Sequence, residues 1–231
     1  MRNIIAFILL IFQINLIIGQ EKNSIEFYSK ESYMIPMRDG VNLYTEVFKP
    51  INEKVNFPFL IKRTPYGVKT DFTINDSIKI NDFSVPLNLA LGGYIFVNQD
   101  VRGRSKSEGV FEIAKPLYHL NNVNKVDEST DAYDTIEWLI NNIENNNGKA
   151  GIYGISYSGL TSLQASVNPH PALKTSSPQA SPADMFLGDD FHHNGAFRLS
   201  YSFEYVYLVG KNKESLTLFP FDDFDVFDWY L

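Results

Sequence analysis

The chain has 231 residues, of which 44% are hydrophobic and 14% aromatic, so it can bury a substantial core and a wholly disordered chain is excluded. Its 27 acidic and 20 basic side chains give a net charge of −7, and no basic run is longer than a pair, which argues against a nucleic-acid partner. Because cysteine is absent, the chain has no disulfide, thiolate metal ligand or cysteine nucleophile.

The N-terminus predicts a signal peptide over residues 1–19, followed by a polar spacer over residues 20–32. Arg2 supplies a positive start, residues 4–12 form a continuous apolar run, and Gly19 is a small residue at which cleavage can occur. The run is short for a membrane span, and an uncleaved anchor is the alternative. We therefore expect a secreted or periplasmic protein with no stable membrane insertion after cleavage.

Two segments after the spacer predict a β-hairpin. Residues 33–37 lead into the turn Arg38-Asp-Gly40, where glycine tolerates the positive φ that such a turn requires. Residues 41–48 alternate apolar and polar side chains, which is typical of a half-buried strand.

The middle of the chain alternates strand and helix patterns. Three short, mostly apolar runs predict buried strands at 57–62, 94–98 and 149–153. Two segments predict helices at 129–140, with Ser129 or Thr130 as the cap, and at 160–167. Strands and helices in this order predict parallel pairing in an α/β sheet. From Pro169 onward the pattern is weaker, and the last residues are dense in aromatic side chains.

The segment Gly151-Ile-Tyr-Gly-Ile-Ser156-Tyr-Ser-Gly159 predicts a nucleophilic serine. A tight turn from strand to helix exposes a serine hydroxyl above the sheet, and it points the next backbone N–H toward a developing oxyanion. Small residues such as Gly154 permit this sharp bend. The usual elbow has glycine two residues after the serine, whereas this chain has Ser158 there and Gly159 one residue later. A glycine-rich turn without a catalytic role is the alternative.

The segment Gly154-Ile-Ser-Tyr-Ser-Gly159 resembles the elbow of the Xaa-Pro dipeptidyl-peptidase and cocaine esterase group of α/β-hydrolases. Other segments resemble motifs of the same group: Arg63-Thr-Pro-Tyr-Gly67, Asp100–Gly109, Asp131–Trp138 and Gly188–Gly195. The last of them is similar to a segment of the α-amino-acid ester hydrolase and glutaryl-7-aminocephalosporanic acid acylase branch. The resemblance implies a truncated α/β-hydrolase fold, with residues 33–200 as the N-terminal part of the hydrolase domain and residues 201–231 as the start of a helical cap.

The resemblance also implies roles for individual residues. Ser156 would form an acyl-enzyme, while the backbone N–H of Tyr157 and the phenol of Tyr66 would donate to the oxyanion. Asp190 would bind the α-ammonium group of the substrate, and Asp189 is an adjacent candidate. The alternatives are a core or loop tyrosine for Tyr66 and a helix cap or surface charge for Asp189. Neither a cofactor nor a metal is expected, and no oligomeric state is predicted.

Four charged residues are expected to have structural roles. Asp100, Arg102 and Arg104 follow a predicted strand, where an Asp–Arg pair usually holds a loop. Glu108 is expected to be a solvated loop charge.

None of the histidines, at positions 119, 170, 192 and 193, has the position expected of a base. In this fold the chain order is serine, then an acid, then histidine. His119 precedes the serine, and the other three follow it too closely to leave room for later strands. The pair His192-His193 is expected to line or support the amine pocket rather than to bind a metal.

We therefore expect a serine hydrolase that acts on α-amino acyl esters or β-lactam side-chain amides. Its substrate would be a small molecule with a free α-amine or a short peptide. The chain alone would be inactive, because the triad acid and base are not in it. The alternatives are an Xaa-Pro dipeptidyl-peptidase, a carboxylesterase and a non-catalytic remnant.

Overall fold

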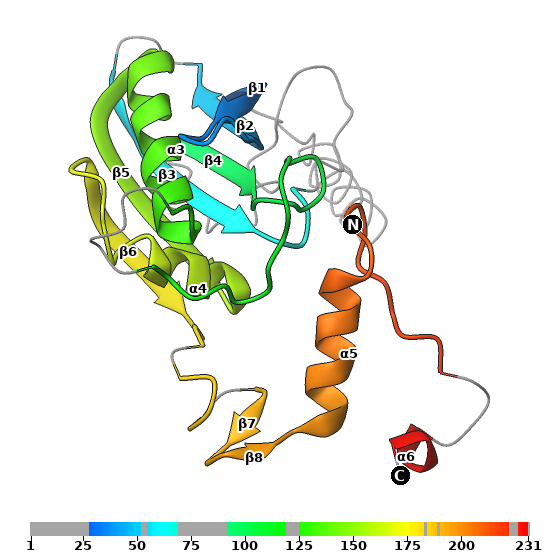
Figure 1. The fold of residues 1–231 in the computed structure, drawn as a ribbon. Coiled ribbons are helices and arrows are strands. Elements are labelled where there is room, and N and C mark those ends of the chain that lie inside the picture. Colours follow the sequence, from blue (N-terminus) through cyan, green and yellow to red (C-terminus); the bar gives the residue numbers. More distant parts are fainter. Residues whose placement is uncertain are drawn as a thin grey trace, which may run out of the picture.

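The computed structural model describes residues 28–51, 55–68, 92–118, 125–182, 184–188, 190–221 and 226–230. Its main element is a six-stranded sheet in the order β1-β2-β4-β3-β5-β6 (Figure 1). The strands of this sheet are β1 (Tyr28–Pro36), β2 (Asn42–Pro50), β3 (Phe57–Thr64), β4 (Ile95–Asp100), β5 (Asn146–Ile155) and β6 (Leu173–Gln179). The predicted signal peptide lies outside the described residues.

The predicted hairpin is confirmed, because β1 and β2 pair antiparallel with Pro36 opposite Asn42. However, β1 begins at Tyr28, inside the segment predicted to be a spacer. The Tyr28 side chain is buried and its ring lies 5.5 Å from that of Phe96, so packing extends the strand into a polar stretch of sequence. Such a contact across the sheet has no local pattern in the sequence.

The predicted parallel pairing is also confirmed, since β3 pairs parallel with both β4 and β5. A further parallel strand, β6, pairs with β5 and was not predicted. Its sequence, LKTSSPQ, is mostly polar and most of its side chains are exposed. It therefore lacks both the apolar run and the alternation by which a strand is recognised.

The two predicted helices are present with shifted starts. Helix α3 (Glu128–Asn142) is capped by Asp127 rather than by Ser129 or Thr130. The Asp127 side chain accepts a hydrogen bond from the backbone N–H of Thr130, and the Thr130 side chain completes a capping box. Helix α4 (Tyr157–Gln164) begins directly after Ser156 rather than at Leu160.

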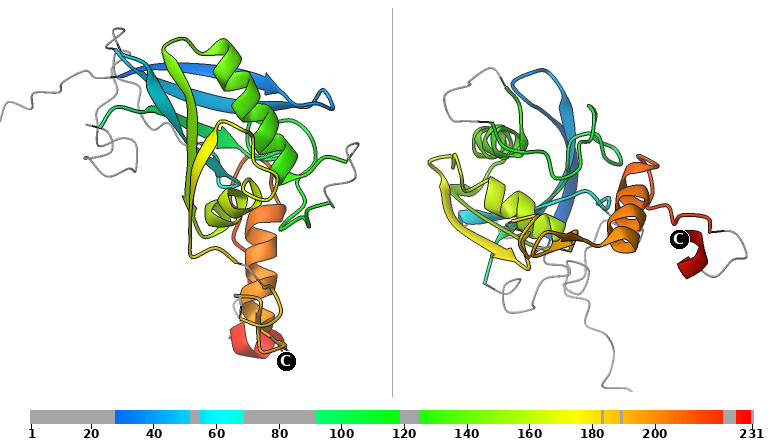
Figure 2. Two further views of the ribbon diagram at one scale, coloured as in Figure 1. Left: turned by 90° about the vertical axis from the view of Figure 1, so that its left-hand side faces the viewer. Right: turned by 60° about the horizontal axis from the view of Figure 1, so that its bottom comes forward.

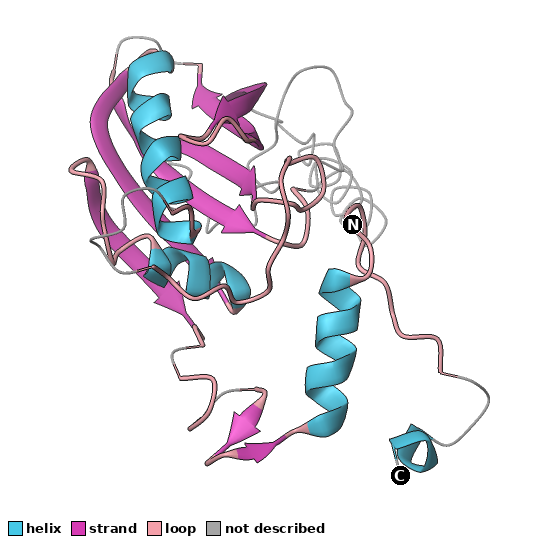
Figure 3. Cartoon of the chain, in the orientation of Figure 1, coloured by secondary structure: helices cyan, strands magenta, loops and turns pink. Residues whose placement is uncertain are grey.

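Both helices cover the same face of the sheet (Figure 3). The core between them and the strands is formed by aliphatic and aromatic side chains, among them Ile35, Val47, Phe59, Ile61, Val97, Ile136, Leu139 and Ile152. On the opposite face, the described residues line an apolar groove of about 580 Å³ that includes Leu60 and Tyr153. The groove runs over β3, β5 and β6.

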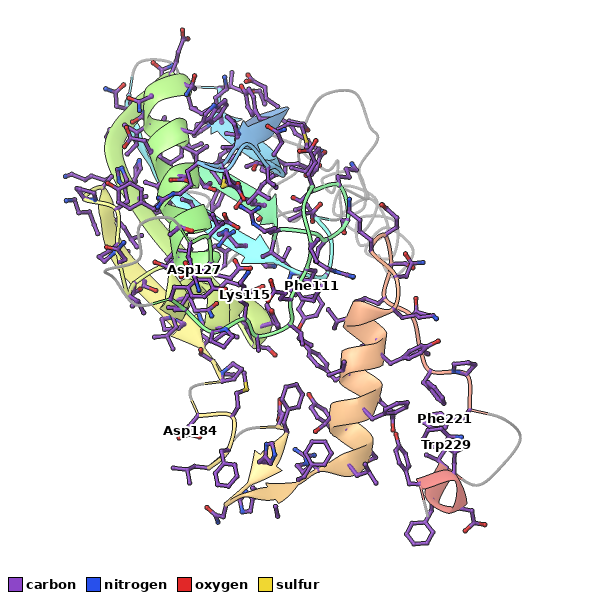
Figure 4. All side chains as sticks on the ribbon, viewed as in Figure 1. Phe111, Lys115, Asp127, Asp184, Phe221 and Trp229 are labelled. Atoms are coloured by element: carbon purple, nitrogen blue, oxygen red, sulfur yellow. The ribbon has the colours of Figure 1, made fainter. Side chains whose placement is uncertain are left out.

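After β6 the chain leaves the sheet and forms smaller elements beside it (Figure 2). These are β7 (His192–His193), β8 (Ala196–Phe197), α5 (Leu199–Gly210) and α6 (Val226–Tyr230). Aromatic rings connect α5 with α6, because Phe219 lies 4.9 Å from Phe203 and 5.0 Å from Trp229. The Phe221 ring also lies beside the Trp229 ring, with centroids 5.4 Å apart (Figure 4). None of the helices in the described residues is long and apolar enough to span a membrane.

The charged residues after β4 are structural, as expected, but they do not pair with one another. Arg102 binds Asp131 at 2.7 Å and Asp39 at 2.8 Å. The Asp131 contact fastens the loop after β4 to α3. The buried Arg104 donates instead to the carbonyl oxygens of Pro65 and Asn212.

Glu108 is exposed, but it is not an unattached loop charge. Its carboxylate accepts hydrogen bonds from the backbone N–H and the side-chain amide of Asn42, each at 2.9 Å. These bonds lower the pKa of Glu108. The carboxylate therefore fastens the loop after β4 to the start of β2.

Asp100 ends β4 with a buried carboxylate. It accepts hydrogen bonds from the backbone N–H of Val68 at 2.6 Å and of Lys106 at 3.3 Å. Burial raises the pKa of Asp100 to about 6, even though both bonds lower it. The carboxylate therefore holds two loops at the carboxyl edge of the sheet. Burying its negative charge costs folding free energy, and this cost depends on pH.

This cost predicts a pH-dependent effect of the substitution Asp100→Asn. The folded-state pKa of about 6 lies above the ordinary value of 3.8, so the stabilising contribution of Asp100 is complete below that lower value and is lost as the pH rises through 6. We expect the stability advantage of the wild type over Asp100→Asn to fall by up to about 3 kcal/mol between about pH 4 and pH 7.5. Urea unfolding at both pH values measures it.

Asp184→Asn is the matched control. Hydrogen bonds from the backbone N–H groups of Leu187 and Phe186 lower the pKa of Asp184, so its pH dependence has the opposite sign. An Asp100→Asn effect that is the same at both pH values would contradict the raised pKa.

Candidate active site

Ser156 lies in the sharp turn between β5 and α4. Its backbone has φ 60° and ψ −124°, a conformation that residues other than glycine rarely adopt. Two hydrogen bonds fix this conformation: its N–H donates to the carbonyl of Gln179, and its carbonyl accepts from the N–H of Leu160. The side chain is exposed. The structure thus places the predicted nucleophile in a strained turn at the carboxyl end of the sheet.

The two glycines of the motif are explained by close backbone contacts. A Cβ at Gly154 would lie 2.2 Å from the carbonyl oxygen of Ser158, and one at Gly159 would lie 2.4 Å from that of Gln179. Gly159 is therefore the position at which α4 approaches β6. Ser158 points into the interior and is buried, which explains why a small side chain is accepted where the usual elbow has glycine.

Tyr157 is the first residue of α4. The N–H groups of the first turn of a helix have no partner within the helix, so the Tyr157 N–H is not used by α4 itself. Its side chain is buried and its hydroxyl accepts from the N–H of Ala114 at 2.8 Å. The ring therefore anchors the loop after β4 against the turn that holds Ser156.

Tyr66 follows the carboxyl end of β3, which is the parallel neighbour of β5. The carboxyl ends of parallel strands meet at one edge of the sheet, so Tyr66 and Ser156 extend from the same edge. The Tyr66 hydroxyl lies 2.9 Å from the hydroxyl of Tyr205 on α5. Tyr66 is thus a half-buried loop residue whose hydroxyl is hydrogen-bonded to α5.

Ser156 and Asp190 line one small cleft of about 30 Å³. Its other walls are the side chains of Ile113, Ala114, Tyr157, Leu160, Pro182, Met185, Phe191, Tyr201 and Tyr205. The exposed Asp190 carboxylate accepts from the Tyr201 hydroxyl at 3.2 Å and lies 3.7 Å from the Arg198 guanidinium. The cleft thus combines a serine hydroxyl, a carboxylate and apolar walls. Asp189 lies outside the described residues.

No histidine in the described part of the chain lines this cleft. His170 lies before the amino end of β6, at the opposite edge of the sheet, where its Nε2 contacts Glu137 at 2.6 Å. His192 contacts the carbonyl of Met185 at 2.7 Å and so supports a residue of the cleft wall. His193 follows it in β7, and His119 lies outside the described residues. The described residues contain no group of three or more candidate metal ligands.

The sequence reasoning missed the contribution of α5 to the site. Tyr201 and Tyr205 stand one turn apart, with ring centroids 6.1 Å apart and nearly parallel planes, and both line the cleft. Arg198 precedes the helix and contacts Asp190. The spacing of the two tyrosines was a usable signal for one face of a helix. The prediction assigned residues 201–231 to the start of a helical cap by resemblance alone and gave these two tyrosines no role.

Comparisons with known proteins agree with this geometry. The family model described as X-Pro dipeptidyl-peptidase (S15 family) matches residues 39–217. The chain belongs to this family. The likeness to solved structures of relatives confirms the predicted α/β-hydrolase fold of this chain. The resemblance to the cocaine esterase group is also confirmed.

Three relatives illustrate the likeness. The cocaine esterase of Rhodococcus sp. (strain MB1 Bresler) is 32% identical over 177 residues, which cover 77% of this chain and 28% of that protein. A crystal structure of an aminopeptidase from a marine sediment Thaumarchaeota archaeon is 39% identical with a TM-score of 0.78, covering 90% of this chain and 34% of that one. The structure of a selenomethionine-labelled α-amino acid ester hydrolase is 37% identical with a TM-score of 0.73, covering 87% of this chain and 33% of that one. The chain thus spans about a third of the length of these relatives.

Proposed function

We propose that this protein is a serine hydrolase that forms an acyl-enzyme at Ser156 and acts on α-amino acyl esters or on β-lactam side-chain amides. The observation that carries the proposal is that the strained Ser156 and the carboxylate of Asp190 line the same cleft. In this proposal the Oγ of Ser156 attacks the acyl carbon and the leaving group departs with a proton. The N–H of Tyr157 and the phenol of Tyr66 stabilise the oxyanion, and water then hydrolyses the ester at Ser156.

A serine attacks at neutral pH only when a base takes its proton. None of the described histidines lines the cleft, and His119 precedes Ser156 whereas this fold places the base after the serine, so we propose that the base and its partner acid come from outside this chain. The 231-residue chain would then be inactive alone. The product of the complete reading frame and the 231-residue chain, assayed side by side with an alanyl ester, test this. Turnover by the chain alone would show that the base is within it.

A second candidate function is supported by the relatives. The family is described as an X-Pro dipeptidyl-peptidase family and one relative is an aminopeptidase, so a peptidase is the alternative. Both activities require recognition of a free amine, and Asp190 suits either. A comparison of an alanyl ester with an alanyl-prolyl anilide on the complete product distinguishes them. A carboxylesterase would hydrolyse an ester without the amine equally well, and a non-catalytic remnant would hydrolyse none of these substrates.

The role proposed for Asp190 predicts a substrate-dependent effect of Asp190→Asn. A hydrogen bond between charged groups contributes about 1.5–3 kcal/mol, and the lower end applies because this carboxylate is exposed. We expect kcat/KM for a free alanyl ester to fall about tenfold, with no change for the N-acetylated ester. Asp184→Asn, in the same segment, is the control and should leave both rates unchanged. An equal loss for both esters would contradict recognition of the amine.

We also propose that the protein is exported to the periplasm or the outside of the cell. The proposal rests on the N-terminal sequence, with its positive start and apolar run. Mass spectrometry of the mature N-terminus after expression in the native host tests it. Cleavage after Gly19 is the expected result, and a retained Met1 would contradict it.

A further inference from the structure

The contact between Tyr66 and Tyr205 joins the sheet to α5 at the edge of the cleft. Their hydroxyl oxygens lie 2.9 Å apart, which is a hydrogen bond in which either atom has the geometry to be the donor. Tyr66 extends from the end of β3, and Tyr205 lines the cleft together with Ser156. Only one of the two phenolic hydrogens can lie between the two oxygens, so the identity of the donor decides where the other hydrogen points.

The role proposed for Tyr66 decides which of the two hydroxyls donates. Within the described residues, each hydroxyl has the other as its one hydrogen-bond partner, and both side chains are half-buried. A Tyr66 hydrogen that points to the oxyanion cannot also lie between the two phenolic oxygens, so Tyr205 is then the donor. In this arrangement both phenolic hydrogens have an acceptor during the reaction, whereas a Tyr66 that donates to Tyr205 leaves the oxyanion without its phenol. Burial and the bond to Tyr66 raise the pKa of Tyr205, in keeping with a neutral phenol.

Both tyrosines are held in place on each side of the contact. The Tyr205 ring packs beside the rings of Tyr201 and Phe191, whose centroids lie 6.1 and 5.9 Å from its own. The Arg104 guanidinium donates at 2.8 Å to the carbonyl of Pro65, the residue before Tyr66. It also donates at 2.6 Å to the carbonyl of Asn212, just after α5. One buried cation therefore fastens the loop of Tyr66 and the end of α5 together.

We propose that Tyr205 is a positioning residue, which donates its phenolic hydrogen to the oxygen of Tyr66 and so directs the hydrogen of Tyr66 toward the acyl oxygen of a substrate at Ser156. The inference rests on the proposed function, in which Tyr66 is an oxyanion donor. A phenol that accepts a hydrogen bond is polarised and donates more strongly. Helix α5 thereby acts on the reaction through Tyr66 without touching the reacting atoms.

The kinetic test uses Tyr205→Phe in the product of the complete reading frame. Removing one neutral hydrogen bond should lower kcat for an alanyl ester about fivefold, with KM changed less than about twofold. In a Tyr66→Phe background the same substitution should have no further effect on kcat, because the hydroxyl on which it acts is gone. Tyr207→Phe, on the same helix and outside the cleft, is the control and should leave kcat unchanged. A loss that persists in the Tyr66→Phe background would overturn the inference.

A spectroscopic test separates this inference from the proposed function. With tyrosine labelled by carbon-13 at Cζ, the resonance of Tyr66 should shift in Tyr205→Phe and not in Tyr207→Phe. If the wild type hydrolyses no ester or amide, the proposed function fails, and this spectrum alone decides whether the two hydroxyls are hydrogen-bonded. In an active enzyme, the kinetic test decides the direction of the bond. An unmoved Tyr66 resonance would overturn the inference whatever the activity.

Discussion

Ser156→Ala is expected to lower kcat/KM of the complete product by at least about a thousandfold, because the nucleophile is lost and the remaining donors only bind the acyl group. Its free energy of unfolding should remain within about 0.5 kcal/mol of the wild type, since alanine at φ 60° is as strained as serine. Ester hydrolysis and urea unfolding measure the two effects. The control is Ser166→Ala, which should keep full activity, because among the described residues the Ser166 hydroxyl donates to the Ser162 carbonyl and lies outside the cleft.

Ser156→Gly separates the strain of the turn from its chemistry. Glycine adopts positive φ freely, so Ser156→Gly relieves the strain of the turn, although glycine loses more conformational entropy on folding. With this entropy cost subtracted, we expect Ser156→Gly to be about 1 kcal/mol more stable than Ser156→Ala. Both variants should be inactive. Substantial activity in either would show that Ser156 is not the nucleophile. Equal stability of the two would show that the turn is not strained.

Arg63→Met is expected to cost about 3–5 kcal/mol of folding free energy, the usual cost of removing one partner of a buried ion pair. Arg63 has no exposed surface and donates to the Gln99 side chain at 2.7 Å and to Glu128 at 2.8 Å. Its guanidinium also lies 3.9 Å from Asp131. Methionine fills a similar volume, so the cost comes from the buried carboxylates that lose their counter-charge.

The pH dependence of this loss identifies its cause. Burial raises the pKa of Glu128 although the nearby Arg63 lowers it, so without the arginine this carboxyl would take up a proton more readily. The loss in Arg63→Met should therefore be smaller at about pH 5 than at about pH 8. Arg38→Met is the control, because its pair with Asp134 is partly exposed and should contribute no more than about 1 kcal/mol. Equal losses for the two variants, measured by urea unfolding, would contradict a special role of the buried pair.

The local pattern of the sequence determined several elements and the position of the nucleophile. Alternating side chains predicted the hairpin of β1 and β2, and apolar runs predicted β3, β4 and β5. The glycine-rich segment from the end of β5 to the start of α4 predicted the turn at Ser156. These features depend on residues close together in the chain, so they can be read from it directly. The same holds for the family, which several ordered motifs indicated before the comparisons confirmed it.

Other features were decided by contacts between distant residues. β6 is polar and forms because β5 offers it a parallel partner, and β1 starts early because Tyr28 packs on Phe96. Arg63 finds its carboxylates more than sixty residues away, on α3. The sequence alone placed Tyr66 and Asp190 near Ser156 only by resemblance, and it gave no role to Tyr205. Their assembly depends on α5 lying against the carboxyl edge of the sheet, which no local pattern encodes, because the partners are separated by up to 139 residues.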